Sequence, residues 1–349
     1  MTGATDTREL LRRLPKAELH CHLDGSVRPG TLLELGAEYG VTMPASDEEA
    51  LAAYMKVTDA RNLEEYLARF SVTLGVMQQP AALERIAYEL AQDVAQEGVR
   101  YVEVRYAPIL NVREGMSLGE AVEAPLRGLA RAERDHGVMG RVIVCAIRNM
   151  DPDMSLELAR LAVAYRSRGV VGFDLAGGEL GYPASLHAEA FRHAQSHDVA
   201  CTCHAGEGDG AESVRQAVHV CGAQRLGHAT RLIEDESLMA HVQEQRIALE
   251  ICLTSNVQTR AATSYASHPL REYYDRGLNV VLNTDNRLMS GTTLVDEYVH
   301  AASALGFTLP ELRRIALNGF ESAFLPPEEK RMLVERARAE MAVADVDAT

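Results

Sequence analysis

Residues 17–26 read Ala17-Glu18-Leu19-His20-Cys21-His22-Leu23-Asp24-Gly25-Ser26, an apolar run in which two histidines lie one residue apart. In an extended strand, residues i and i+2 point to the same face, so both imidazoles can bind a single metal ion. A pair of this kind also arises by chance on surface strands. Further potential ligands lie in three later stretches, Cys203-His204-Ala205-Gly206-Glu207, Leu226-Gly227-His228-Ala229 and Asn283-Thr284-Asp285-Asn286.

Eight short runs rich in Val, Ile and Leu recur along the chain, and segments with the apolar spacing of amphipathic helices separate them. The runs are Ala17–Leu23, Val99–Ala107, Val142–Arg148, Val170–Leu175, Val199–His204, Arg225–His228, Ala248–Leu253 and Leu278–Thr284. This alternation predicts an α/β fold, a single (β/α)8 TIM barrel of parallel strands. The alternative is an open doubly wound sheet. Such a sheet usually has a Gly-rich phosphate loop after its first strand, where this chain has His20-Cys21-His22.

The barrel predicts where the candidate residues lie, because functional side chains of this fold gather at the C-terminal ends of its strands. Every candidate falls at such an end. They are His20 and His22 on the first strand, Gly177 after the fourth, His204 and Glu207 at the fifth, His228 at the sixth and Asp285 at the eighth.

The segment between the first two strands, residues 24–98, is much longer than one crossover helix requires. Within it, Leu63, Tyr66, Leu67 and Phe70 share one helical stripe. Such a stripe is often core, but its position above the barrel mouth predicts extra helices that form a lid over a substrate. We expect one domain over residues 1–349, with a flexible tail at 342–349.

The composition excludes several classes of partner. The formal net charge of −15 disfavours nucleic acid and anionic membranes, which would repel the chain. We see no membrane span of about 18 apolar residues and no signal peptide. The six cysteines form no CxxC pair, as expected of small buried side chains in a reducing cytoplasm. The oligomeric state cannot be predicted.

A zinc ion held by His20, His22, His204 and Asp285 would have three nitrogen ligands and one oxygen ligand, and zinc lowers the pKa of bound water. Asp285 ends an almost wholly apolar strand, where an unpaired carboxylate is costly. Its alternative role is a helix N-cap. Sites with two metals typically bridge them through a modified lysine on the fourth strand. The run Val170–Leu175 contains no lysine, so we expect one Zn²⁺ per chain, although nickel, cobalt or iron suit the same ligands.

Two further residues are suited to moving protons. Glu207 follows His204 by three residues, which places a carboxyl close to the metal without binding it. His228 lies opposite and could orient the attacking water. A lone histidine after a strand more often has a structural role, but this one ends its strand at the same face as the other candidates.

Six stretches of the chain resemble the adenosine deaminase family of metal-dependent amidohydrolases. They are Glu18–Ser26, Tyr101–Tyr106, Phe173–Gly177, His204–Glu207, Arg225–His228 and Asn283–Asp285. The resemblance covers essentially the whole chain and implies hydrolytic removal of ammonia from carbon 6 of adenosine or 2′-deoxyadenosine, a reaction of purine salvage. The implied partner is therefore a small purine nucleoside.

The resemblance also implies individual roles. Glu207 would protonate purine N1, and His228 with Asp285 would position and deprotonate the water. The backbone N–H of Gly177 would meet purine N3, and Asp24 would bind the ribose 5′-hydroxyl. His22 would contact the substrate as well as the metal. Relatives that act on the free base vary at the position of Asp24, so its presence favours a nucleoside.

One position departs from the family pattern. Many members follow the metal-binding aspartate with a second Asp that faces purine N7, whereas this chain has Asn286. An amide N–H can donate to N7 directly, but the change leaves other 6-aminopurine nucleosides open, such as 5′-methylthioadenosine or aminodeoxyfutalosine. A non-catalytic nucleoside-binding relative is a further alternative, which the complete set of candidate ligands and acids disfavours.

Overall fold

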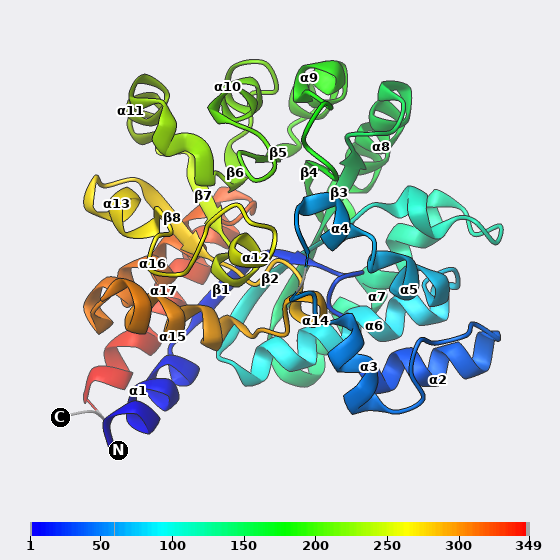
Figure 1. Ribbon diagram of the computed structural model, residues 1–349, viewed down its shortest axis with the longest axis horizontal. Helices are drawn as coiled ribbons and strands as arrows, with labels where there is room; N and C mark the ends of the chain where they lie inside the picture. Colours follow the sequence, from blue (N-terminus) through cyan, green and yellow to red (C-terminus); the bar gives the residue numbers. More distant parts are fainter. Residues whose placement is uncertain (1, 59, 347–349) are drawn as a thin grey trace.

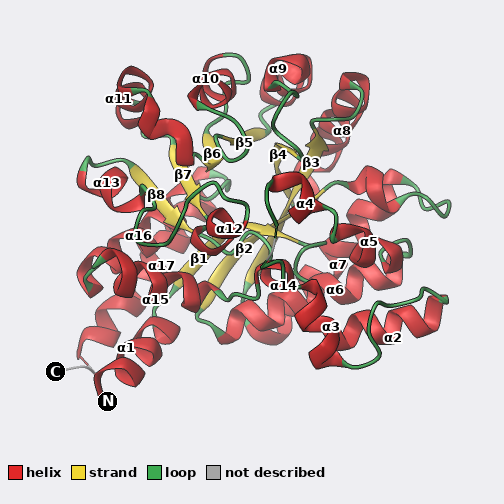
Figure 2. Ribbon diagram, in the orientation of Figure 1, coloured by secondary structure: helices red, strands yellow, loops and turns green. Residues whose placement is uncertain are grey.

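The computed structural model describes residues 2–58 and 60–346, and within them eight parallel strands form one sheet in the order of the sequence. Helices surround the strands on the outside (Figures 1 and 2). The strands are β1 Lys16–His22, β2 Val99–Tyr106, β3 Met139–Ile147, β4 Val170–Ala176, β5 Ala200–Ala205, β6 Arg225–His228, β7 Ala248–Ile251 and β8 Asn279–Leu282. The predicted (β/α)8 TIM barrel is confirmed, with strand ends shifted by a few residues.

The barrel closes where the chain after β8 meets β1. The backbone N–H of His22 donates to the carbonyl of Asp285 at 2.7 Å, and the N–H of Asp285 donates to the carbonyl of His20 at 2.9 Å. An isolated parallel bridge joins Cys21 to Asp285 at the same point. These bonds fix the backbone of Asp285 directly beside the two histidines of β1.

Helices follow most of the strands and bury their apolar faces against the sheet. In α6, Pro80–Gln96, the side chains of Leu83, Ile86, Leu90 and Val94 are buried at three- and four-residue spacing, which is the pattern of an amphipathic helix. After β2 the helices are α7 Leu118–His136, α8 Pro152–Tyr165, α9 Ala188–Ser196, α10 Ala211–His219, α11 Glu236–Glu244, α12 Leu253–Gln258, α13 Leu270–Asp275, α14 Arg287–Ser290, α15 Leu294–Leu305, α16 Leu309–Ser322 and α17 Pro327–Val346. Short 3-10 turns occur at Pro108–Asn111, Arg166–Arg168, Ala184–His187 and Thr230–Glu234.

The long insertion between β1 and β2 contains helices, as predicted. They are α2 Pro29–Tyr39, α3 Glu48–Met55, α4 Leu63–Leu67, α5 Phe70–Val76 and α6 Pro80–Gln96. The predicted stripe spans two short helices, because α4 ends before Ala68 and α5 begins at Phe70. The hydroxyl of Tyr66 lies 3.0 Å from that of Ser290, which fastens α4 to α14.

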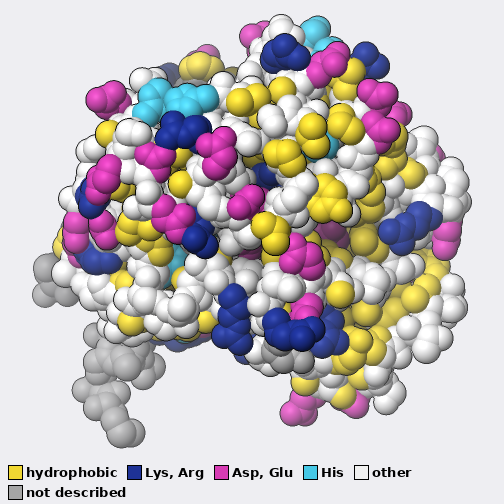
Figure 3. Space-filling model, turned by 45° about the horizontal axis from the view of Figure 1, so that its top comes forward, with side chains coloured by type: hydrophobic (Ala, Val, Ile, Leu, Met, Phe, Trp, Pro, Cys, Tyr) yellow, Lys and Arg dark blue, Asp and Glu magenta, His cyan; other side chains and the backbone are white. Residues whose placement is uncertain are grey.

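The described part of the chain begins with α1, Thr2–Arg13, and ends with α17. Helix α1 precedes β1 (Figure 1). At the other end α17 continues to Val346, so part of the predicted tail at 342–349 is helical, and 347–349 lie outside the described residues. In the part of the chain that the structure describes, no helix is long and apolar enough to cross a membrane. The face drawn in Figure 3 carries acidic, basic and hydrophobic side chains intermingled.

Candidate active site

Four potential metal ligands converge at the C-terminal end of the barrel. The ligand atoms of His20 and His22 from β1, His204 from β5 and Asp285 from the end of β8 all lie within 4.8 Å of one another. Nε2 of His22 is 3.1 Å from Nε2 of His204 and 3.3 Å from Oδ1 of Asp285. All four side chains are buried. Side chains up to 265 positions apart in the sequence are thus brought together by the strand order.

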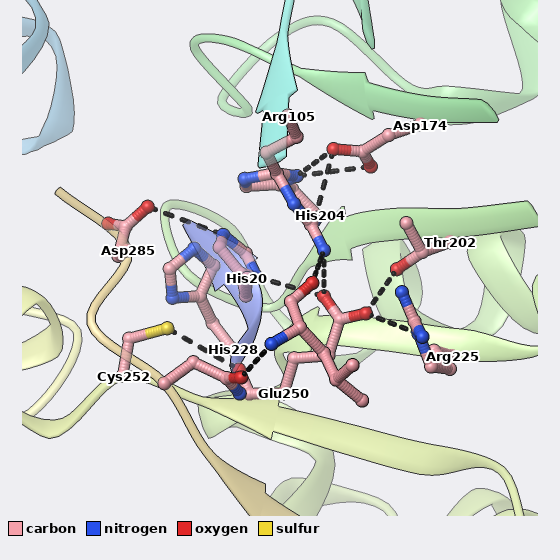
Figure 4. Close-up of polar contacts among 12 residues, drawn as sticks. His20, Arg105, Asp174, Thr202, His204, Arg225, His228, Glu250, Cys252 and Asp285 are labelled. Carbon is pink, nitrogen blue, oxygen red and sulfur yellow. Dashed lines mark hydrogen bonds and ion pairs between the residues drawn. The ribbon is translucent and has the colours of Figure 1, made fainter. Parts of the chain in front are cut away.

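The protonation of these histidines fits a metal ion. Nδ1 of His20 lies 2.9 Å from Oε2 of Glu250, and Nδ1 of His204 lies 3.1 Å from Oδ2 of Asp174 (Figure 4). A carboxylate partner holds the proton of a neutral imidazole on Nδ1 and leaves the lone pair on Nε2. Nε2 of His20 is buried and has no hydrogen-bond partner. Several lone pairs and a carboxylate facing one point are the donor set of a zinc site.

A network of buried charges holds the two carboxylates in place. The guanidinium of Arg105 lies between them, 3.2 Å from Oδ2 of Asp174 and 2.9 Å from Oε2 of Glu250. Arg225 and Thr202 donate to the other oxygen of Glu250, at 2.7 and 3.1 Å. Burial alone would raise the pKa of Asp174, but His204 and Arg105 hold that pKa well below its usual value. Both carboxylates are therefore charged and fixed beneath the histidines.

Asp285 faces the histidines and does not cap a helix. Its backbone is left-handed, with φ of 60°, and the N-cap of α14 is Asn286, so the alternative role considered from the sequence is not what the structure contains. Oδ2 of Asp285 accepts a hydrogen bond of 2.6 Å from Ser255, and Oδ1 points toward the ligand cluster. Burial would raise its pKa, yet His20, whose Nε2 lies 3.3 Å from Oδ1 of Asp285, and the other nearby histidines hold the pKa well below the usual value.

Glu207 and His228 lie together beside this cluster. Nε2 of His228 is 3.4 Å from Oε2 of Glu207, and Oε1 of Glu207 is buried without a hydrogen-bond partner. Burial, with the negative charges of Asp285 and Glu179, raises the pKa of Glu207 well above its usual value. Burial also lowers the pKa of His228 well below the usual value of histidine. Both shifts favour the uncharged form, a carboxylic acid beside a neutral imidazole, and a proton donor must carry its proton before the reaction.

The loop that carries Glu207 is held by a carboxylate from another strand. Glu179, which follows β4, accepts the backbone N–H groups of Gly206 at 2.6 Å, Glu207 at 2.9 Å and Gly208 at 2.6 Å. A row of N–H groups pointing at one anion is a rigid arrangement. The buried Glu179 thus fixes the backbone from which Glu207 projects.

The cluster opens into a cavity of about 420 Å³ that both the barrel and the insertion line. Asp24 and Asn286 lie in its wall, and each has a buried Oδ1 with no partner. Gly177, with φ of 95°, lies there too, and a Cβ at this position would be 3.1 Å from a methyl carbon of Ile147. Leu63, Tyr66, Leu67 and Phe70 cover the cavity, which agrees with the predicted lid.

Another cavity lies at the opposite end of the barrel, away from the ligand cluster. It measures about 820 Å³ and is lined by residues that precede or begin the strands, such as Val170, Ala200 and Ala248. The metal-ligand groups found among the described residues all lie at the C-terminal end, so the smaller cavity is the candidate active site.

Sequence reasoning missed the residues that support the ligands. Asp174, Glu250 and Arg105 stand inside apolar strands, and a charge in such a place signals a buried ion pair. Asn256 and His268, which lie behind His228, gave no comparable signal. Their relation to the site depends on how α12 and the loop before α13 pack.

Comparison with known proteins agrees with this geometry. The family model "Adenosine deaminase" matches residues 15–340. The chain belongs to the adenosine deaminase family. Adenosine deaminase 1 of Streptomyces coelicolor is a member 42% identical over 95% of this chain and 87% of its own length.

Solved structures resemble this family member over most of its length. The adenine deaminase of Arthrobacter aurescens has a TM-score of 0.87 at 27% identity, covering 94% of this chain and 99% of its own. An amidohydrolase from Burkholderia ambifaria, solved with bound Zn, has a TM-score of 0.86 at 26% identity, covering 99% of this chain and 96% of its own. The fold is therefore shared with these solved structures, one of which contains zinc.

Proposed function

We propose that this protein is a hydrolase that converts adenosine and 2′-deoxyadenosine, with water, to inosine and 2′-deoxyinosine plus ammonia. The observation that carries the proposal is the close pair Glu207 and His228 beside the three-histidine, one-aspartate cluster in a single cavity. Relatives about 40% identical that are named adenosine deaminase support the substrate. The alternatives, 5′-methylthioadenosine and aminodeoxyfutalosine, are not favoured by these relatives.

One zinc ion per chain would be held by His20, His22, His204 and Asp285. The donor set and the protonation imposed by Asp174 and Glu250 support this assignment, as does the bound Zn of the Burkholderia relative. When bound, the ion supplies Lewis-acid activation of water at neutral pH. All four ligands are buried, so the lid and the barrel would exclude bulk water from the reaction.

The residues of the chain would divide the remaining work. Oε1 of Glu207 donates its proton to purine N1, which makes carbon 6 more electrophilic. His228 and Asp285 orient the attacking water, and Asp285 takes its proton. The water oxygen adds to carbon 6, Asp285 passes the proton to the amino nitrogen, and the bond from carbon 6 to that nitrogen breaks to release ammonia. The remaining hydroxyl proton replaces the one that Glu207 donated as the carbonyl forms. Because burial raises the pKa of Glu207 well above its usual value, the protonated form that an acid requires is favoured.

Four groups would position the nucleoside. The backbone N–H of Gly177 would bind purine N3, the amide of Asn286 would bind N7, and Asp24 would bind the ribose 5′-hydroxyl, while His22 would border the substrate. The unpartnered Oδ1 of Asp24 supports its role, since buried polar atoms normally have hydrogen bonds. Burial raises the pKa of Asp24 to about 7.

A substrate panel tests the proposal. Zinc-loaded protein is incubated with adenosine, 2′-deoxyadenosine, adenine and 5′-methylthioadenosine, and deamination is followed by ultraviolet absorbance. We expect the highest kcat/KM for the first two. Chelation should abolish turnover and one equivalent of zinc should restore it. No turnover of adenosine by the zinc-loaded protein would refute the assignment. We place the reaction in the cytoplasm, in line with the six free, buried cysteines.

A further inference from the structure

A chain of hydrogen bonds runs from the protein interior to His228. The backbone N–H of Leu270 lies 3.0 Å from Nδ1 of His268, Nε2 of His268 lies 3.1 Å from Oδ1 of Asn256, and Nδ2 of Asn256 lies 2.9 Å from Nδ1 of His228. His228, Asn256 and His268 are all buried. Among the residues lining the cavity, only His228 belongs to this chain.

The direction of every bond follows from the first one. A backbone N–H is always a donor, so Nδ1 of His268 must be the acceptor. Burial lowers the pKa of His268 to about 3, so the ring is neutral and its single proton is on Nε2. That N–H donates to Oδ1 of Asn256, which turns the amide nitrogen toward His228. Nδ1 of His228 is then an acceptor, and its proton must lie on Nε2.

This proton faces the acid of the site. Nε2 of His228 lies 3.4 Å from Oε2 of Glu207, which is longer than an ideal N–H···O hydrogen bond but makes Oε2 the nearest acid oxygen to this nitrogen. An oxygen that faces an N–H is the carbonyl oxygen of an uncharged carboxyl. The acid proton of Glu207 is then on Oε1, the buried atom that has no partner and is free for the substrate. With the opposite tautomer, the lone pair on Nε2 would compete for that proton.

We propose that Asn256 and His268 are positioning residues that keep His228 in its Nε2–H tautomer and thereby place the acid proton of Glu207 on Oε1. The inference rests on the proposed function and refines it. In the resting enzyme His228 is a hydrogen-bond donor, to Glu207 and to the attacking water, and is not the base. The removal of a proton from water falls to Asp285.

The first test is spectroscopic and needs no substitution. Long-range ¹H–¹⁵N correlation spectra of the zinc-loaded protein, labelled in histidine, distinguish the two tautomers by which ring nitrogen carries hydrogen. His228 is identified by the signal lost in His228→Gln. We expect the Nε2–H tautomer for both His228 and His268. An Nδ1–H pattern for His228 would overturn the proposal, and this measurement does not depend on which substrate the enzyme uses.

The second test inverts the polarity of the chain. Asn256→Asp keeps the shape of the side chain but accepts from both rings, so His228 must protonate Nδ1. We expect kcat for adenosine to fall roughly 10²- to 10⁴-fold, the effect of a misplaced proton donor, with KM changed less than about threefold and zinc retained. His268→Gln keeps an amide donor in the place of Nε2 and should retain most of the activity.

A matched control separates this effect from the cost of a buried carboxylate. Asn318→Asp places one in α16, where Asn318 donates to the carbonyl of Val280 at 3.0 Å, away from the cavity. Its kcat should equal that of the wild type. Wild-type kcat in Asn256→Asp would refute the positioning role, whereas a wild-type enzyme without adenosine turnover would refute the proposed substrate.

Discussion

Glu179 binds the backbone of Glu207: its Oε2 accepts the N–H of Glu207 at 2.9 Å and that of Gly208 at 2.6 Å. The same carboxylate helps to raise the pKa of Glu207, after burial and Asp285, because like charges disfavour ionisation. One anion therefore both fixes the position of the proposed proton donor and keeps it protonated.

The substitution Glu179→Gln tests this link. An amide has one acceptor atom in place of two, so at least one buried backbone N–H would lose its partner. We expect kcat to fall about tenfold or more and the free energy of unfolding to fall by about 1–3 kcal/mol. The control is Glu64→Gln, since Glu64 is an exposed carboxylate near Gly178. Unchanged kcat in Glu179→Gln would show that the hydrogen bonds accepted by Glu179 are not needed for catalysis.

Glu207→Gln should separate metal binding from catalysis. The amide fits the same space and no proposed ligand is lost, but the acidic proton is gone. We expect one zinc per chain by metal analysis and a kcat reduced about 10²- to 10⁴-fold. A variant with near-normal turnover would exclude Glu207 as the acid.

Asp174→Asn should weaken the metal site without removing a ligand. The amide can no longer accept the Nδ1 proton of His204 as a charged partner, and Arg105 loses one of its two carboxylates. We expect zinc affinity to fall about 10- to 100-fold in competition with a chelator. Substituting Glu234, an exposed residue paired with Arg231, by Gln provides the control. Equal affinities in both variants would contradict the role of Asp174.

Acid should destabilise the protein partly through His268. Burial lowers its pKa to about 3, below the usual 6.5. Between pH 6.5 and pH 3, His268 is therefore protonated in the unfolded chain but not in the folded protein. Stability from this group is complete above pH 6.5 and is lost as the pH falls toward 3, by up to about 1.4 kcal/mol per pH unit. Urea unfolding at several pH values should show a shallower loss for His268→Gln. Parallel curves for the two proteins would refute the prediction.

The parts of the structure that follow from local patterns could be predicted. Eight apolar runs separated by amphipathic segments gave the barrel, and the positions of His20, His204 and Asp285 at strand ends gave their common face. The supporting residues could not be found in this way. Whether Glu250 contacts His20, 230 positions earlier, depends on the register of β7 against β8 and on how the chain after β8 meets β1. The chain of hydrogen bonds through His268 depends on how loops pack, and loop packing leaves no periodic pattern in the sequence.

The apolar stripe on the lid shows a second limit of prediction from the sequence. Leu63 and Phe70 are spaced as on one helix, yet the chain divides there into α4 and α5. Both interpretations of the stripe hold in part, because Leu63 and Tyr66 are buried and also line the cavity. Spacing indicates which residues share a face, but not where a short helix ends.

The junction between His22 and Asp285 joins the first strand of the barrel to the segment after the last one. The four ligands can therefore meet only after residue 285 has been synthesised, and any fragment ending before position 285 lacks one of them. A cation bound there would stabilise the closed barrel, because separating β1 from the segment after β8 would also separate the ligands of the cation. We therefore expect metal binding and closure of the barrel to occur together, late in the folding of this enzyme.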